Sequence, residues 1–466
     1  MPQRLVMKFG GTSVSSKMAI DNIRSIIKDA QTAWHEIVIV ASALSGVTNS
    51  LLEAVNAGGN SDLAAESLRS RHFSLLQEVV ADQNDRAAAE AEIEDLIEEF
   101  LKLSKAMDVL GDGSPKSLDA VVSLGERMSV VLLAAGLNAH GFKSQPVSAA
   151  SLIVTDDRYQ NASPDLAATK LQAARVLRPL FEEGIIPVAT GFIGAAPNGH
   201  VTTLGRGGSD YSATILGNAL EAGEVWIWTD VDGIMTADPR IAADAKTLPT
   251  LSYREAAELA YFGAKVLHPK AIRPVVDENI PVRVCNTFNP SHPGTVLTAN
   301  QHVSKSQTVK AVTVIRDQCL VTIEGRGMLG VPGVAARAFS AVANLDTSVT
   351  LISQASSEQS ICFSVPKEST AYVIEALQKT FQGELKSRDI DSIWSLEDIV
   401  IITAVGAGMR NTPGIAGKIF SALGDLGINV IAIAQGSSEV SISLVTSDED
   451  KDATVRAIHG LIVADQ

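Results

Sequence analysis

The chain has 466 residues, of which 46% are hydrophobic, so it is long enough to bury more than one hydrophobic core. Its 53 acidic residues outnumber the 38 basic residues and give a formal net charge of −15 at pH 7. A charge of this sign repels nucleic acid and anionic lipid. The composition therefore predicts a multidomain globular protein and argues against a nucleic-acid or membrane role.

The three cysteines, Cys285, Cys319 and Cys362, are far apart and show no CxxC or Cys/His spacing. This pattern predicts neither a disulfide framework nor a zinc site, and it is typical of buried thiols in a reducing cytosol. The N-terminus passes from Met1 directly into a strand-like segment without a signal peptide, and we find no apolar run of about 20 residues that could span a bilayer. We therefore expect a cytoplasmic protein without a metal site built from its own side chains.

Short runs rich in β-branched residues alternate with segments of helical periodicity over residues 1–300. The runs are RLVMKFG, EIVIVASA, IIPVATGFIG, EVWIWTD and PVRVCN. This alternation predicts an α/β domain with a mostly parallel sheet. Residues 85–107 carry apolar side chains on one stripe among Glu and Asp, which predicts an amphipathic packing helix. A segment rich in Pro, Ser, Thr, Asn and Gln follows at 289–308 and is typical of a linker.

The rest of the chain contains an internal repeat. The stretch that starts at Gly327 matches the stretch that starts at Gly408 without a gap, an offset of 81 residues. Each copy has the pattern strand, helix, strand, strand, helix, which predicts two small domains at 316–395 and 396–466. The second copy ends directly after its last helix and lacks a closing strand, so we expect a strand from residues 308–315 to cross over and complete its sheet.

Two glycine-rich turns carry the strongest chemical signals. The first strand ends in KFGGTS, which places Lys8 beside Gly10 and Gly11. Bare backbone amides can approach phosphate oxygens closely, and a lysine adds a compact positive charge. A plain strand-to-helix turn is the alternative, and the Walker pattern GxxxxGK[ST] occurs nowhere in the chain.

The second turn, LGRGGSDYS, precedes the helical segment SATILGNAL. A helix start, free amides and Arg206 would converge there on an anion such as a phosphate or an α-carboxylate. Asp210, within the same turn, is a candidate partner for Lys8. The alternative is an N-cap aspartate beside an incidental arginine.

Polar residues also follow the strand EVWIWTD, at the end of a strand where open α/β sheets usually bind ligands. Thr229 and Asp230 could contact a ribose, a base or a metal-bound phosphate, and Arg240 lies farther along the same loop. The later segment YFGAKVLHP contains Lys265 and His268. A histidine beside a proline is more often structural than catalytic.

Together these motifs resemble those of the aspartate kinases, which have an amino acid kinase domain followed by two ACT domains. The resemblance runs from Lys8 to near the C-terminus and rests on KFGGTS, SLGER, LGRGGSDYS, WTDVDGIMTADPR and YFGAKVLHP. It implies a three-layer αβα kinase domain with a mostly parallel sheet, and two ferredoxin-like βαββαβ domains. The implied reaction transfers the γ-phosphate of ATP, with Mg²⁺, to the side-chain carboxylate of L-aspartate, the first step of lysine, methionine and threonine biosynthesis.

The resemblance also implies roles for individual residues. Lys8 would stabilise the transferring phosphoryl group, Asp210 would organise Lys8, and Glu126 would bind the substrate's ammonium group. The implied substrate contacts, besides Glu126, are Ser42, Thr48, Arg206, Gly207, Gly208 and Ser209. The implied ATP contacts are Lys8, Gly10, Gly11, Thr229, Asp230, Met235, Arg240 and Lys265.

The implied chemistry agrees with the lack of a well-placed histidine base. A carboxylate acceptor is already ionised at pH 7 and needs no base to attack phosphorus, whereas an alcohol acceptor would need one. Met235 stands where many family members have a tyrosine, which leaves its adenosine contact open.

The ACT resemblance implies inhibition by an end-product amino acid bound between ACT units that pair across a homodimer or a dimer of dimers. LISQASSE and AIAQGSSE place Gln354 and Gln435 at equivalent positions, with Asn429 ahead of the second. This arrangement resembles the threonine-responsive members more than the lysine-responsive ones. A glutamine at a strand end can also be a satisfied polar residue.

Two alternatives to a regulated aspartate kinase are a catalytically inactive kinase-like amino-acid sensor and a sister kinase for glutamate or acetylglutamate. The first alternative is disfavoured because the chain retains the implied catalytic and binding residues Lys8, Glu126, Arg206, Asp210 and Lys265. Most sister kinases lack the ACT pair. Related chains also occur fused to a homoserine dehydrogenase that begins roughly where this chain ends.

Overall fold

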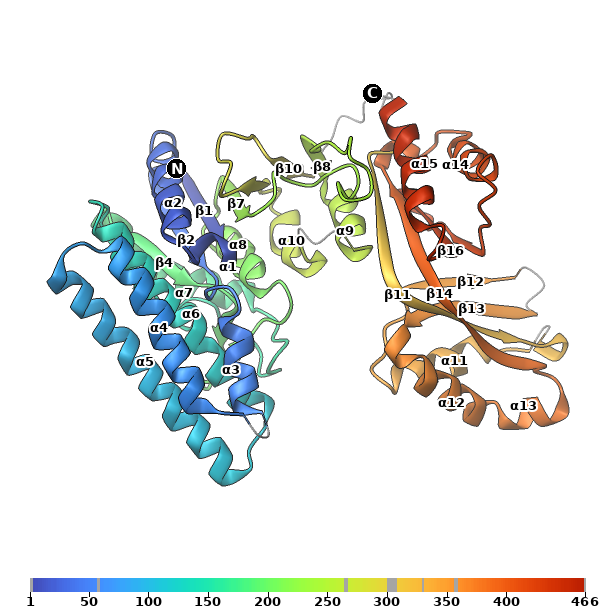
Figure 1. Cartoon of the computed structure of the whole chain (residues 1–466), viewed down its shortest axis with the longest axis horizontal. Helices are drawn as coiled ribbons and strands as arrows, with labels where there is room; N and C mark the ends of the chain where they lie inside the picture. Colours follow the sequence, from blue (N-terminus) through green and yellow to red (C-terminus); the bar gives the residue numbers. More distant parts are fainter. Residues whose placement is uncertain are drawn as a thin grey trace. The chain divides into compact units, whose positions relative to one another are not determined.

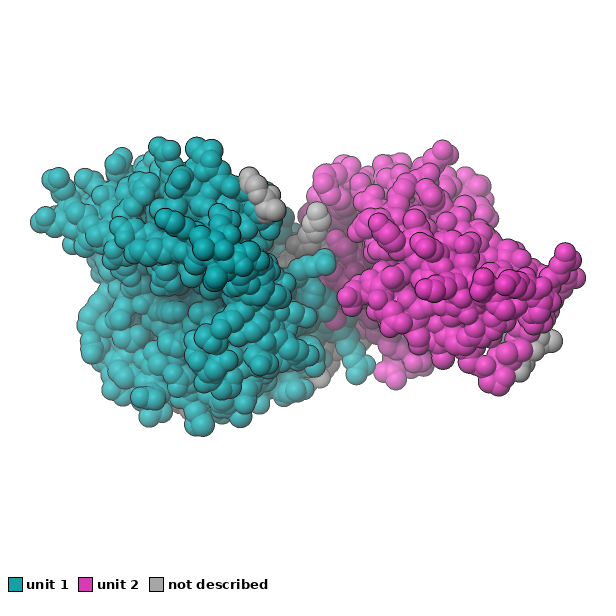
Figure 2. Space-filling model, turned by 90° about the horizontal axis from the view of Figure 1, so that it is seen from below, with its two compact units in different colours: residues 1–234, 247–256, 265–301 teal, residues 235–246, 257–264, 302–466 magenta. Residues whose placement is uncertain are grey.

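The protein divides into two compact units, which Figure 2 colours teal and magenta. Unit 1 contains residues 1–234, 247–256 and 265–301, and unit 2 contains residues 235–246, 257–264 and 302–466. Two short stretches from the first 300 residues therefore belong to the unit that the repeat builds. The computed structural model describes residues 3–56, 59–263, 267–299, 308–328, 331–355 and 359–464.

Unit 1 is built on an eight-stranded sheet with the order β3-β4-β2-β1-β7-β9-β10-β8. Neighbouring strands run parallel except for β9 and β10, so the predicted α/β domain with a mostly parallel sheet is confirmed. The strands are β1 (Arg4–Phe9), β2 (Glu36–Ala41), β3 (Ser144–Val147), β4 (Ile186–Thr190), β7 (Glu224–Thr229), β8 (Thr250–Ser252), β9 (Val282–Asn286) and β10 (Thr295–Thr298). A separate hairpin pairs β5 (Ile193–Ala195) with β6 (Val201–Thr203).

The central strand β1 sends alternate side chains to the two faces of this sheet, as the period of two requires. Leu5, Met7 and Phe9 join the main hydrophobic cluster of the unit, which also contains residues from α2 to α6. Lys8 points to the opposite face, towards α8. The helices of this part of the chain are α1 (Gly11–Val14), α2 (Lys17–Ala30), α3 (Val47–Val55), α4 (Ser61–Val79), α5 (Gln83–Leu110), α6 (Pro115–Asn138), α7 (Leu166–Glu182), α8 (Gly208–Ala219), α9 (Tyr253–Tyr261) and α10 (Pro269–Val276).

The predicted amphipathic helix is α5, which buries Ile93, Leu96, Ile97 and Phe100 in this cluster. It packs on α4 and α6 (Figure 1). We expected no apolar segment long enough to span a bilayer, but α6 is long and apolar enough to do so. Of its most apolar 18-residue stretch, 83% is buried within the protein. We interpret α6 as a core helix, because α4, α5 and the sheet enclose it.

Unit 2 contains a six-stranded sheet with the order β12-β13-β11-β14-β16-β15, in which all neighbours are antiparallel. The strands are β11 (Ala311–Glu324), β12 (Leu351–Gln354), β13 (Ser360–Pro366), β14 (Ser392–Val405), β15 (Ala432–Ala434) and β16 (Ser441–Ser447). The helices are α11 (Val334–Ala343), α12 (Thr370–Thr380), α13 (Gln382–Ser387), α14 (Ile415–Gly424) and α15 (Lys451–Ala464).

The long strands β11 and β14 each pass through both repeats. Ala311–Ile315 pair with β14 residues of the second repeat, from Val405 back to Ile401, as expected of the crossing segment. The later part of β11 pairs with β13 and with the start of β14. Residues 311–315 therefore close the sheet of the second repeat, whereas the start of β14 closes the sheet of the first repeat.

Candidate active site

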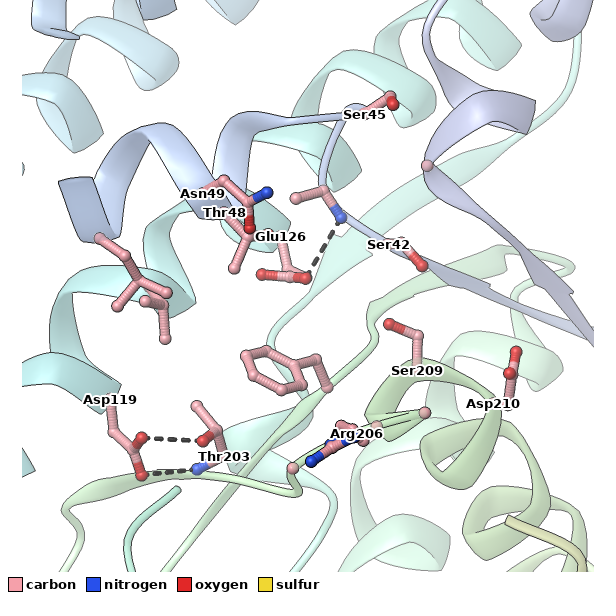
Figure 3. Close-up of a pocket in the computed structure, with 18 of the residues that line it drawn as sticks. Ser42, Ser45, Thr48, Asn49, Asp119, Glu126, Thr203, Arg206, Ser209 and Asp210 are labelled. Atoms are coloured by element: carbon pink, nitrogen blue, oxygen red, sulfur yellow. Dashed lines mark hydrogen bonds between the residues drawn. The ribbon is translucent and has the colours of Figure 1, made fainter. Parts of the chain in front are cut away.

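A cavity of about 570 Å³ opens in unit 1 at the carboxyl ends of β1 and β2. It lies between the turns after these strands, one face of α6 and the glycine-rich turn before α8 (Figure 3). Most of the predicted substrate and phosphate residues line it. They are Lys8, Gly11, Ser42, Thr48, Glu126, Arg206, Gly207, Gly208, Ser209 and Asp210.

Lys8 and Asp210 form an ion pair between the central strand and the first turn of α8. The Lys8 Nζ lies 2.6 Å from Asp210 Oδ1, and both side chains are largely buried. A buried lysine stays charged only if an opposite charge compensates for its lost hydration. Asp210 therefore holds a positive charge at the cavity wall. The N-cap of α8 is Gly207, without a side-chain cap, so the alternative of an N-cap aspartate is wrong.

Glu126 is a fully buried carboxylate on α6 that is only half satisfied. Its Oε1 accepts a hydrogen bond from the Ala43 amide at 3.3 Å (Figure 3), and its Oε2 has no hydrogen-bond partner in the described chain. Burial raises the pKa of Glu126 to about 8. The cavity therefore lacks a countercharge at this point, and a ligand ammonium group would supply it.

Arg206 provides the opposite charge in the glycine-rich turn. Its guanidinium group lines the cavity and is exposed, and no described residue is paired with it. Ser209, in the first turn of α8, lies beside it. A free arginine next to a helix N-terminus suits a carboxylate, since both the charge and the helix dipole favour an anion.

The glycine-rich turn needs glycines for steric reasons. Gly207 has a φ of +67°, a conformation that L-residues other than glycine adopt at a cost. A Cβ on Gly208 would lie 2.5 Å from Cδ2 of Phe192, which also lines the cavity. The turn can therefore lie close to the cavity only because these positions carry no side chain.

Asp119 is a site residue that the motifs did not reveal. Its carboxylate is buried and accepts hydrogen bonds from the Thr203 amide and hydroxyl, both at 2.8 Å, and from the Gln160 amide at 2.9 Å. Asp119 thus fixes β6 just before the glycine-rich turn. The sequence does contain one indication of this role. Asp119 lies seven residues before Glu126 on the same helix, so the two side chains share one face, two helical turns apart.

The turn after β2 is fixed to the turn after β1. Ser15 Oγ accepts a hydrogen bond from the Ser45 amide at 2.8 Å and donates one to the Gly11 carbonyl at 2.5 Å. A Cβ on Gly11 would lie 2.9 Å from the Ala43 carbonyl oxygen. This close approach holds Ser42 and Thr48 at the cavity, while Gly10 donates to the Trp228 carbonyl of β7 and does not line it.

The remaining predicted ATP residues that the structure describes do not line this cavity. Thr229 ends β7 and donates a hydrogen bond to Asp230 at 3.1 Å. Met235 and Arg240 belong to unit 2, where Asp238 binds the exposed Arg240 guanidinium at 2.6 Å. Lys265 lies outside the described residues.

His268 is structural, as its sequence context favours. It is the N-cap of α10, and its Nδ1 accepts a hydrogen bond from the Lys270 amide at 3.2 Å. A Cβ on Gly207 would lie 2.6 Å from the His268 Cβ, so the histidine packs against the back of the glycine-rich turn. Burial and the nearby Arg206 lower the pKa of His268.

Magnesium would depend mainly on the phosphates of the nucleotide for its ligands. The described residues contain no group of three His, Cys, Asp or Glu side chains arranged to hold a metal ion. Nucleotide-bound Mg²⁺ is usually held by phosphates, water and one or two carboxylates.

The predicted effector residues lie in unit 2, two of them at strand ends. Gln354 ends β12, Gln435 follows β15, and both side chains are exposed, as is that of Asn429. Although β12 and β15 are opposite edges of the sheet, residues of both strands pack in one hydrophobic cluster. The two glutamines therefore occupy equivalent ends of strands that share a core.

The geometry defines a class of protein before any comparison. Glu126 and Arg206 provide a negative and a positive group on different walls of one cavity, as an α-amino acid requires, and Lys8 adds a cation beside a glycine turn for a phosphoryl group. Fold and cavity together are those of an amino acid kinase.

The comparisons with known proteins agree. Residues 3–286 match the model of the amino acid kinase family, and residues 321–381 and 402–461 match an ACT domain. The chain is 35% identical over 461 residues to aspartokinase 3 of Arabidopsis thaliana, covering 97% of this chain and 80% of that protein. The chain therefore belongs to the amino acid kinase family, among the aspartokinases, and the resemblance drawn from the motifs is confirmed.

Other relatives are longer. The chain is 36% identical over 462 residues to bifunctional aspartokinase/homoserine dehydrogenase 1 of Zea mays, covering 97% of this chain and 50% of that protein. It thus spans about half the length of the bifunctional relatives that it matches.

Solved structures show the same architecture. E. coli aspartokinase III in complex with aspartate and ADP matches with a TM-score of 0.81 and 31% identity, covering 98% of this chain and 99% of that one. Aspartate kinase of Clostridium acetobutylicum matches with a TM-score of 0.80 and 27% identity, covering 98% and 100%.

The raised pKa of Glu126 predicts a pH dependence of stability. The folded protein holds this proton up to about pH 8, whereas the ordinary pKa is 4.5, so the free energy of unfolding falls as the pH rises through this window. We expect Glu126→Gln to remove a penalty on the order of a few kcal/mol at pH 8 and none at pH 4. Thermal unfolding of the ligand-free protein at pH 5.5 and 8.5 measures this difference.

The matched control is Glu92→Gln, which changes an exposed glutamate on the neighbouring helix α5. It should retain the pH dependence of the parent protein. Equal slopes for the parent and Glu126→Gln would contradict the assignment of a buried, half-satisfied carboxyl group.

Proposed function

We propose that the chain is an aspartate kinase that transfers the γ-phosphate of ATP to the side-chain carboxylate of L-aspartate and yields 4-phospho-L-aspartate and ADP. The observation that carries this proposal is the half-satisfied carboxylate of Glu126 in the same cavity as the unpaired Arg206 and the Lys8–Asp210 pair. E. coli aspartokinase III, a structural relative, binds aspartate and ADP. The product would enter lysine, methionine and threonine biosynthesis.

Aspartate would bind through its two ends. Glu126 would accept hydrogen bonds from the substrate ammonium group, and Arg206 would bind the α-carboxylate, with Ser42, Thr48 and the amides of Gly207, Gly208 and Ser209 as further contacts. This placement leaves the side-chain carboxylate to face Lys8. Specificity for a short dicarboxylic amino acid follows, because the distance between the two binding groups and the lysine sets the length of the substrate.

The transfer needs position and charge more than acid–base chemistry. The ionised side-chain carboxylate attacks the γ-phosphorus, the bond between that phosphorus and the bridging oxygen of ADP breaks, and the leaving oxygen retains the electron pair. Lys8, held by Asp210, would neutralise the charge on the transferring group. Gly10, Gly11, Thr229, Asp230, Met235, Arg240 and Lys265 are the further proposed contacts of ATP and its Mg²⁺.

The proposal also includes the cellular location of the enzyme and its regulation. The cysteines Cys285, Cys319 and Cys362 are all free, and the first two are buried, which supports a cytoplasmic location. We also propose that the ACT domains pair across a homodimer or a dimer of dimers and bind an inhibitory amino acid, with threonine favoured over lysine.

A coupled assay tests the catalytic proposal. The parent protein should release ADP only when aspartate is present, and glutamate or acetylglutamate should not replace it. Lys8→Met should lower kcat about 100-fold or more, because the transferring phosphoryl loses its nearest cation. Glu126→Gln should raise the KM for aspartate about 10- to 100-fold and leave the KM for ATP nearly unchanged, because a charged hydrogen bond to the ammonium group is lost.

Lys102→Met is the control for charge removal, since Lys102 is an exposed residue of α5 that pairs only with Glu98 in the described chain. It should behave as the parent. ADP release that does not depend on aspartate, or equal activity of Lys8→Met and Lys102→Met, would reject the proposal. A complete lack of ADP release would favour a catalytically inactive sensor.

The effector assignment has its own test. Threonine should inhibit steady-state turnover more strongly than lysine, and Gln435→Ala should weaken that inhibition while uninhibited turnover stays nearly intact, since Gln435 lies at a strand end of unit 2 and not in the cavity. Titration of both amino acids into parent and variant measures this. Gln382→Ala, an exposed change on α13 away from the strand ends, is the control. Equal inhibition of parent and Gln435→Ala would reject the assignment.

A further inference from the structure

Arg206 lies between two glycines in the turn before α8. Gly205 and Gly207 both have positive φ values, +77° and +67°. Glycine allows many backbone conformations, so a turn with a glycine on each side of Arg206 is loose unless other residues fix it. The Arg206 guanidinium group pairs with no described residue. Its position in the cavity wall therefore depends on what holds the backbone before and after this turn.

Lys270, in the first turn of α10, holds the backbone before the turn. Its Nζ donates hydrogen bonds to Asn161 Oδ1 at 2.7 Å, to the Leu204 carbonyl at 3.1 Å and to the Ala162 carbonyl at 3.3 Å. A lysine ammonium group has three N–H donors, so these three acceptors can use all of them. A Cβ on Gly205 would lie 3.0 Å from the same Asn161 Oδ1. Lys270 therefore fixes both Leu204 and the side chain against which Gly205 packs.

The same ammonium group also contacts the residue that follows the turn. The Lys270 Nζ lies 5.1 Å from the centre of the Tyr211 ring, a distance at which a cation is attracted to an aromatic face. The Tyr211 side chain is buried, and its amide donates to the Gly207 carbonyl at 2.9 Å. One lysine thus contacts the chain two residues before Arg206 and five residues after it.

A second charged residue, Asp119 of α6, fixes the adjoining backbone. It accepts hydrogen bonds from the Thr203 amide at 2.8 Å and from the Gln160 amide at 2.9 Å. The Ala162 amide donates to the Thr203 carbonyl at 2.9 Å. The end of β6 is therefore firmly held, and Lys270 extends this support to the glycine-rich turn itself.

We propose that Lys270 is a positioning residue for the substrate: it holds the glycine-rich turn so that the Arg206 guanidinium group lies where the α-carboxylate of aspartate binds. The inference rests on the proposed kinase function and deepens it, because it extends the aspartate site to a residue behind the cavity wall. Lys270 itself does not line the cavity. Its loss therefore acts on the KM for aspartate through Arg206, and not on the KM for ATP.

The first test compares two charge removals on α10. Lys270→Met removes the ammonium group and keeps an apolar stem, whereas Arg273→Met removes an exposed cation from the same helix. We expect Lys270→Met to raise the KM for aspartate about tenfold, because hydrogen bonds from a charged donor are lost. The KM for ATP should stay near the parent value, and Arg273→Met should behave as the parent. Calorimetric titration with aspartate alone should show the same loss of affinity without relying on turnover.

A double-mutant cycle separates positioning from a general structural defect. Arg206→Gln removes the group that Lys270 positions, and the described contacts of Lys270 are with other residues. Independent effects of the two changes should multiply, whereas effects that share one group should not. We expect Lys270→Met to lower kcat/KM for aspartate less than about twofold when Arg206→Gln is already present. This ratio, taken at low aspartate, stays measurable when the substrate binds weakly.

An unchanged aspartate affinity of Lys270→Met would overturn the inference. Equal rises in the KM for aspartate and the KM for ATP, or independent losses in the double-mutant cycle, would also overturn it, because either result indicates a general structural defect. A parent protein that binds aspartate without releasing ADP would reject the proposed kinase function alone, and the calorimetric comparison would still decide the role of Lys270. A parent that binds no aspartate would reject both.

Discussion

The ion pair between Lys8 and Asp210 is the interaction on which the active site depends. It joins the central strand of the sheet to the first turn of α8, and it brings a buried cation to the cavity wall. Without the aspartate, the lysine would lose hydration with no compensating charge. Local structure places both residues. Side chains alternate between the two faces along β1, so Lys8 lies on the face towards α8, and Asp210 lies in the first turn of that helix.

The two buried carboxylates of the cavity differ in how fully the protein satisfies them. Asp119 and Glu126 are both buried carboxylates on one face of α6, but Asp119 accepts three hydrogen bonds and Glu126 accepts one from another residue. The satisfied carboxylate stabilises the glycine-rich turn, whereas the half-satisfied one is a cost to the folded state. A bound ammonium group would offset this cost. Active sites commonly contain groups that destabilise the folded protein until the ligand binds.

The sequence predicts the parts of this structure that depend on short patterns. Glycine turns at strand ends place most of the cavity residues, and an absent closing strand in the second repeat predicts the crossover of residues 310–315. It does not predict that residues 235–246 and 257–264 belong to unit 2, because loop docking depends on surfaces that come together only after both units fold. Asp119 is not predicted for a similar reason: its role depends on hydrogen bonds to Thr203 and Gln160, which lie far from it in the sequence.

The second unit holds segments of the catalytic chain on both faces of its sheet. Ala237 and Ala242 pack in the cluster that contains α14 and α15, while Phe262 packs in the cluster on the other face, where Thr313 of β11 donates to its carbonyl at 2.8 Å. Glu258, on the same helix as Tyr261, accepts a hydrogen bond from Ser441 at 2.7 Å. β11 contributes to both clusters and runs through both repeats. A shift of one repeat against the other must therefore strain at least one of these two segments, since the strand between them is continuous and its packed core has little freedom to deform.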